Sequence, residues 1–164
     1  MKRLSPAWLL DCGGGVMVAI GLSNVLHVVE DKSLLHRVPL APVHCNRVLL
    51  WQKRILPAVD IATLVGVAAP AARASYACVL GWRDTHGVSE YGVLLIFGLP
   101  RQIGISDADQ IRPANADADR WRGLALGFFS YHKRITPIID PAALFGSVQQ
   151  STMVPVERVT HRSA

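Results

Sequence analysis

The feature that most constrains this 164-residue chain is an internal repeat. Residues 53–66 read KRILPAVDIATLVG, and residues 133–146 read KRITPIIDPAALFG, at a constant offset of 80 positions. Eight of the fourteen positions are identical. A match at a fixed offset is typical of a duplicated structural unit. The chain is therefore expected to fold as two related halves.

Each copy of the repeat predicts a strand followed by a short helical turn. The strand contains Pro57, which has no N–H group for a sheet hydrogen bond, so it is expected to lie at an edge or to bend there. Asp60 is expected to cap the helical turn that follows, because a short carboxylate accepts from free N–H groups at a helix start. Gly66 is expected to close that turn. A role for the Asp beyond capping stays open.

Short strands with turn residues between them fill most of the chain. Residues 7–12 and 16–22 flank Gly13-Gly14-Gly15 and predict a hairpin, as do residues 76–82 and 91–97. The pattern predicts a mostly β fold. We expect one domain over residues 1–146, made of two small intertwined units with an internal boundary near residues 67–75. Residues 147–164 are expected to form a flexible tail.

Composition places the chain among well-packed globular proteins. Hydrophobic residues make up 51% of the sequence and charged residues 18%, which argues against disorder. Three cysteines cannot pair completely, so a reducing compartment is expected. The start of the chain resembles a signal peptide, but Asp11 and the three glycines interrupt its apolar segment. A cytoplasmic protein without membrane insertion is therefore expected, since no apolar run approaches about 18 residues.

The net charge of +5 raises the alternative of a small basic β-barrel that binds nucleic acid. The seventeen Lys and Arg residues are spread mostly singly along the chain, whereas a surface that follows phosphates usually needs clustered cations. A solvated basic surface is the preferred interpretation, and no nucleic-acid partner is expected.

The known catalytic and metal-binding motifs are incomplete in this sequence. His44 and Cys45 are adjacent, whereas a zinc site needs paired ligands at wider spacing. Residues 115–119 resemble the start of a calcium loop, but Arg120 and Leu126 stand where Gly and Glu are required. We therefore expect no enzyme, no metal and no cofactor. A site assembled from scattered histidines, namely His27, His86 and His132, is the remaining enzymatic alternative.

Several segments occur in the order found in one known family, and together they span about residues 7–146. The most characteristic is residues 48–60, which resembles the pattern Gly-Val-x-Asn-Leu-Arg-Gly-x-Ile-x-Pro-Val-x-Asp-Leu. The chain resembles the CheW-like adaptor family of bacterial chemotaxis-type signalling. The other matching segments are residues 16–20, 25–28, 38–42, 91–95, 109–113 and 135–144.

This resemblance implies a fold of two five-stranded β-barrel subdomains that share a hydrophobic seam. It implies a non-catalytic adaptor or scaffold in signal transduction, with a CheA-like histidine kinase and a methyl-accepting chemoreceptor as partners. In such proteins one barrel docks on the kinase and a groove near the seam receives the receptor tip.

The chain departs from the family pattern at the positions that face the receptor. The motif Asn-x-Arg-Gly is replaced by residues 50–53, so Gln52 stands at the Arg position, and His27 stands at a motif Glu. Gln cannot replace the charge-assisted donor of Arg. This divergence suggests an accessory adaptor, for example in a chemosensory system for pilus-driven twitching. The expected protein contacts are Val25, His27, Arg47, Trp51, Gln52 and Lys53, with core packing as the alternative for Trp51.

Overall fold

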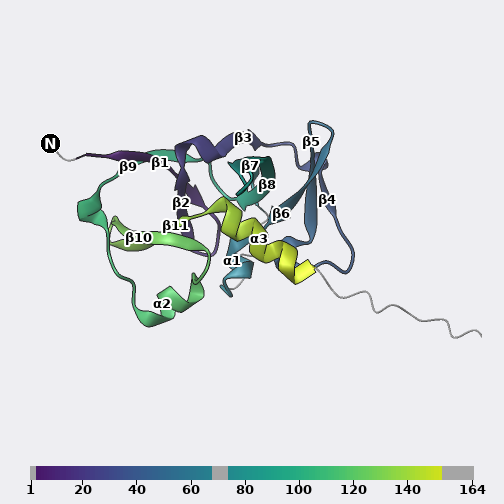
Figure 1. Ribbon diagram of the computed structural model, residues 1–164. Coiled ribbons are helices and arrows are strands. Elements are labelled where there is room, and N and C mark those ends of the chain that lie inside the picture. Colours follow the sequence, from purple (N-terminus) through teal and green to yellow (C-terminus); the bar gives the residue numbers. More distant parts are fainter. Residues whose placement is uncertain (1–2, 68–73, 153–164) are drawn as a thin grey trace, which may run out of the picture.

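The computed structural model describes residues 3–67 and 74–152 (Figure 1). Two β-sheets lie side by side, and helix α3 crosses the junction between them. The expected mostly β fold is confirmed. The expected internal boundary falls largely on residues 68–73, and the end of the expected tail on residues 153–164, both outside the described residues.

The first sheet, sheet A, has five strands. The predicted hairpin around the three glycines is confirmed, since β1 and β2 pair antiparallel. All three glycines have positive φ, from 61° to 79°, which explains why this turn needs residues without a side chain. The strand order is β10 (Ala125–Tyr131), β11 (Arg134–Ile139), β2 (Met17–Gly21), β1 (Ser5–Asp11) and β9 (Arg101–Ile105).

The second sheet, sheet B, has six strands rather than five. A three-residue strand is added at its edge beyond the five that correspond to sheet A, because residues 35–37 pair antiparallel with β5. The order is β3 (Val25–Val29), β7 (Tyr76–Arg83), β8 (Ser89–Ile96), β6 (Arg54–Val59), β5 (Arg47–Trp51) and β4 (Leu35–Arg37).

Helices are few and short. The α-helices are α1 (Ile61–Leu64), α2 (Asn115–Arg120) and α3 (Pro141–Thr152), and the 3-10 turns are η1 (Leu22–Asn24), η2 (Lys32–Leu34), η3 (Val43–Cys45) and η4 (Asp107–Asp109). Residues 147–152, which the sequence places in the tail, continue helix α3. Helix α3 continues because Phe145 and Val148 are buried on one of its faces, and that burial stabilises the added turns.

The sequence repeat is also a structural repeat. In each copy a two-residue turn joins two antiparallel strands, β5 with β6 and β10 with β11. The cross-strand partners are related by the same offset of 80, so that Leu49 faces Leu56 and Phe129 faces Thr136. The second strand of each hairpin then pairs in parallel with a strand of its own sheet, through Ala58 in sheet B and Ile138 in sheet A.

The repeated proline marks the point where the third strand joins each hairpin. The parallel pairing of β6 with β8 begins at Ala58, directly after Pro57, and β11 pairs with β2 at Ile138, directly after Pro137. A proline has no N–H group to donate across a ladder. Among the described strands, the segment before each proline therefore has a neighbour on one side only.

The repeated aspartate caps the helix that follows, as the sequence predicts. The Asp60 carboxylate accepts from the Thr63 N–H at 3.2 Å, and the Asp140 carboxylate accepts from the Ala142 N–H at 3.1 Å. The first helix ends at Leu64, and the turn after it closes at Gly66, whose φ is 79°. Gly146, the equivalent residue of the second copy, lies inside α3.

The largest core lies between the two sheets, and we call it the shared core. Sheet A contributes residues such as Leu10 and Ile20, and sheet B contributes residues such as Leu80 and Leu94. Both α1 and α3 add apolar side chains to it. A second cluster, the sheet B core, is made of Val29, Leu49, Leu56, Ala58, Ala77, Val79, Val93 and Leu95 from the strands of sheet B.

The burial pattern of β11 gives a direct test of this packing. Ile139 is 1% exposed in the shared core, whereas Ile135 on the same strand is 44% exposed. Ile139→Ala is expected to lower the free energy of unfolding by about 2–4 kcal/mol, because it removes buried methyl groups and leaves a cavity. Ile135→Ala is expected to cost clearly less. Urea denaturation measures both, and equal losses would contradict the assigned burial.

Candidate protein-binding surface

The tip of the β5–β6 hairpin carries two of the predicted contact residues in an uncommon conformation. Gln52 has φ 45° and Lys53 has φ 62°. Positive φ at both central residues is the geometry of a type I′ turn, which matches the twist of the flanking strands. Turns of this type usually hold Asn and Gly, because other side chains are strained in the left-handed region. Both side chains of this turn are exposed at the tip of the hairpin.

Trp51 is half-buried beside this turn. It packs against the edge of the sheet B core, and its ring centroid lies 5.8 Å from that of Tyr91. The Arg54 guanidinium carbon lies 4.8 Å from the centroid of the same tyrosine ring, within the range of a cation–π interaction. Trp51 therefore packs against the sheet B core and keeps part of its ring exposed, and its role as a protein contact stays a prediction.

Two open grooves flank Tyr91 on the side of sheet B. One, of about 420 Å³, lies against β6 and includes Arg54, Pro57 and Phe145. The other, of about 430 Å³, lies against the start of β3 and includes Leu26. Trp82 and Tyr91 line both grooves. We call the set Leu26, Trp51, Arg54, Trp82 and Tyr91 the aromatic surface.

Contacts with the shared core hold the aromatic surface in place. The Trp82 ring stacks on Phe145 of α3, with centroids 4.9 Å apart and planes 9° apart. Close packing also requires Gly92, where a Cβ atom would lie 2.3 Å from Phe145. The stack packs Trp82, which lines both grooves, against the shared core, so this wall of each groove is formed without a partner.

The predicted residues of β3 lie at the other end of sheet B. Val25 is half-buried, pairs with Leu80 and packs against the shared core. His27 is exposed and pairs with Val79. A bulge between them turns Leu26 outward, where it is 46% exposed and packs over Gly81. Leu26 thereby connects β3 to the aromatic surface.

Arg47 does not join the other predicted residues. It begins β5 and pairs with Ala58 and Arg37, at the end of the hairpin remote from the Gln52–Lys53 turn. Arg47 is on β5 and His27 is on β3, and these two strands are four strand spacings apart in sheet B. That separation is about 19 Å across the sheet. The structure therefore brings together Trp51, Gln52 and Lys53 but leaves Arg47 apart.

Four members of this surface, Leu26, Arg54, Trp82 and Tyr91, are absent from the predicted contacts. Arg54 was assigned to the repeat, Tyr91 to a strand and Trp82 to the end of another strand. These residues lie close together because β8 pairs with β7 on one side and with β6 on the other. The strand β6 is distant from β7 and β8 in the sequence. Aromatic residues near strand ends were the sequence feature that could have indicated this surface. The strand pairing decides which of them lie close together.

The three histidines considered for an enzymatic site lie on separate elements. His27 is on β3, His86 is in the turn between β7 and β8, and His132 is in the turn between β10 and β11. Within residues 3–67 and 74–152, no group of three His, Cys, Asp or Glu residues is placed to hold a metal ion.

The cysteines are placed as packing residues rather than nucleophiles. Burial raises the pKa of the Cys78 thiol to about 12 and raises the pKa of Cys12 well above its usual range. A thiol in this state carries little of the reactive thiolate at neutral pH. Cys45 is half-buried, and its pKa is also raised by burial.

A comparison with models of protein families assigns this two-sheet chain to a family. The model of the CheW-like domain matches residues 7–149. The chain belongs to the CheW-like domain family. A similar solved structure is the scaffolding protein TtCheW from Thermoanaerobacter tengcongensis, with a TM-score of 0.64 and 12% identity over 86% of this chain and 87% of that chain. At this identity the likeness establishes the fold.

Two further findings accompany this assignment. No curated protein matches the sequence. Among the helices in the described part of the chain, none has both the length and the apolar character required to cross a membrane.

The CheW-like pattern has a glycine at one position of the strained Gln52–Lys53 turn. Lys53 stands where the family motif Asn-x-Arg-Gly ends in Gly, and the structure gives it a φ of 62°. This backbone conformation favours glycine, so the family glycine has a structural reason. The motif arginine corresponds to Gln52, the other residue of the same turn.

Replacement of the strained lysines is expected to stabilise the fold. Lys53→Gly should raise the free energy of unfolding by about 0.5–1 kcal/mol, because relief of the left-handed strain exceeds the added freedom of the unfolded chain. Lys133 has φ 63° in the equivalent turn, so Lys133→Gly should give a similar gain. Chemical denaturation of both variants tests this, and a loss in either would contradict the turn geometry.

Proposed function

We propose that this CheW-like protein is a non-catalytic adaptor that couples a methyl-accepting chemoreceptor to a CheA-like histidine kinase. The observation that carries the proposal is the aromatic surface, where Trp51, Tyr91 and Arg54 gather at the tip of the hairpin that holds the family motif. Tryptophan, tyrosine and arginine are the residues most enriched at the energetic centres of protein interfaces.

The shape of the surface supports a protein partner. Two shallow grooves flank Tyr91, and exposed apolar side chains lie beside them, including Leu26, Leu50 and Ile55. A stable complex buries on the order of 1,600 Å² in total. Half-buried aromatic side chains with pre-formed grooves can anchor such an interface without reorganising.

The departures from the family motif support an accessory role. His27 stands at a motif Glu and Gln52 at a motif Arg, so one negative and one positive charge of the usual pattern are absent here. Charge complementarity contributes mainly to partner choice. We therefore propose that the chain serves a specialised chemosensory system, with pilus-driven twitching as the example suggested by analogy.

A matched pair of substitutions tests the binding surface. Trp51→Ala is expected to weaken binding to the kinase's own CheW-like domain or to the receptor tip at least tenfold, because an anchor side chain is lost. Tyr131 occupies the equivalent position of the second hairpin, so Tyr131→Ala is the control and should leave that affinity unchanged. Isothermal titration calorimetry with purified kinase and receptor fragments measures both. Absence of wild-type binding to either fragment at tens of micromolar would refute the adaptor role.

The motif arginine can be restored to test the proposed divergence. Gln52→Arg is expected to raise affinity for a receptor tip of the ordinary chemotaxis type by about tenfold, because a charge-assisted donor is regained. The matched control is His132→Arg, at the equivalent turn position of sheet A. An unchanged affinity for the Gln52→Arg variant, with wild-type stability, would show that this position does not set receptor choice.

A further inference from the structure

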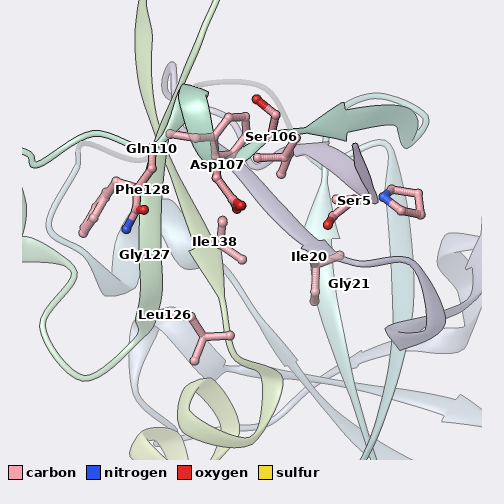
Figure 2. A pocket seen from close by; sticks show the side chains of 14 residues that line it. Ser5, Ile20, Gly21, Ser106, Asp107, Gln110, Leu126, Gly127, Phe128 and Ile138 are labelled. Carbon is pink, nitrogen blue, oxygen red and sulfur yellow. The ribbon is translucent and has the colours of Figure 1, made fainter. Parts of the chain in front are cut away.

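One side of sheet A carries an open pocket of about 420 Å³, which we call the cavity, shown in Figure 2. It lies among the start of β1, the end of β2, the end of β9 and the β10–β11 hairpin. Among the residues that line it are Ala7, Gly21, Ile105, Gly127, Phe129 and Ile138. Pockets that hold small organic molecules have volumes of about 300–1,000 Å³ and mainly apolar walls.

The internal repeat explains why the cavity is present in sheet A. Ala58 of β6 pairs with Val93, and its equivalent Ile138 of β11 pairs with Ala19. Two residues further along these partner strands, sheet B has Leu95 opposite Ala77, and sheet A has Gly21 opposite Ala7. A leucine side chain that helps to fill the sheet B core is therefore missing from sheet A.

One further position of the repeated hairpin widens the same space. Arg47 of sheet B is replaced by Gly127, which lines the cavity. A Cβ atom built at Gly127 would meet no heavy atom within 4 Å, and its φ lies outside the left-handed range. The backbone would therefore accept a side chain here, and the space for it is empty.

The mouth of the cavity combines an exposed apolar rim with one acidic group. A bulge between Ala125 and Gly127 turns Leu126 outward, where it is 72% exposed. Figure 2 shows the Asp107 carboxylate pointing into the space above Ile138. Asp107 forms no ion pair with the residues that the structure describes, and the Gln110 side chain lies at the same mouth.

We propose that this cavity binds a small organic cation with an apolar body, of the alkylammonium or arylalkylammonium class. The apolar walls remove the body of the ligand from water. The Asp107 carboxylate accepts a charge-assisted hydrogen bond from the ammonium group. A carboxylate ligand of the same length would be repelled by Asp107, and an alcohol would form only a neutral hydrogen bond. This site is additional to the adaptor function, since it lies on sheet A rather than at the aromatic surface.

The test uses the full chain, labelled with ¹⁵N, and n-hexylamine as the probe. We expect saturable binding below 1 mM, with amide shifts at Gly21, Gly127 and Ile138 and none at Gly81 or Gly92 of sheet B. n-Hexanol should bind about tenfold more weakly, and n-hexanoate and ethylamine should not bind measurably. Shifts spread over both sheets, or equal binding of hexylamine and hexanoate, would overturn the proposal.

Two variants separate the apolar and the charged parts of the site. Gly127→Leu should abolish hexylamine binding by filling the cavity. Its matched control is Gly98→Leu, because Gly98 also has open space at its Cβ position and lies outside the cavity. Asp107→Asn should weaken hexylamine binding about tenfold and leave hexanol binding unchanged. Wild-type affinity in both Gly127→Leu and Asp107→Asn, in protein with a native amide spectrum, would exclude this site.

Discussion

Packing in the shared core holds the two sheets together, and the other features of the molecule depend on it. Each sheet alone leaves one apolar face uncovered, and the faces carrying Leu10 and Leu80 cover each other together with α1 and α3. The same contacts place Phe145 against Trp82, so the core of the molecule also fixes one wall of the aromatic surface. An interface built on a packed core needs little ordering when a partner binds.

Duplication produced two hairpins with the same backbone and different surroundings. Both have positive φ at the two turn residues, a proline before the parallel pairing and a capping aspartate after it. The side chains then diverged. Sheet B has a filled core and an aromatic tip, whereas sheet A has Gly21 and Gly127 where Leu95 and Arg47 stand in sheet B. These differences are the basis for proposing a protein-binding surface on one copy and a small-ligand site on the other.

Only some of the predicted contact residues lie together, because neighbours in the sequence can be far apart along an extended strand. Trp51, Gln52 and Lys53 are consecutive and remain adjacent at one turn. Arg47 is only four residues from Trp51, yet an extended strand places it about 13 Å away. Tyr91 is far along the chain, and strand pairing places its ring under Arg54. The predicted contacts, taken from residues 25–27 and 47–53, therefore covered only part of the surface.

The sequence by itself determined the duplicated unit, its capped helix start and the mostly β fold, because these depend on local preferences of Pro, Asp, Gly and alternating apolar residues. It also indicated the CheW-like family, since the motif segments keep their order. Only the tertiary structure decided that α3 extends past Gly146, that β4 adds a sixth strand, and that Leu26, Tyr91 and Trp82 form one surface. Those outcomes depend on which distant side chains pack together, and on where small residues leave space, which no local pattern specifies.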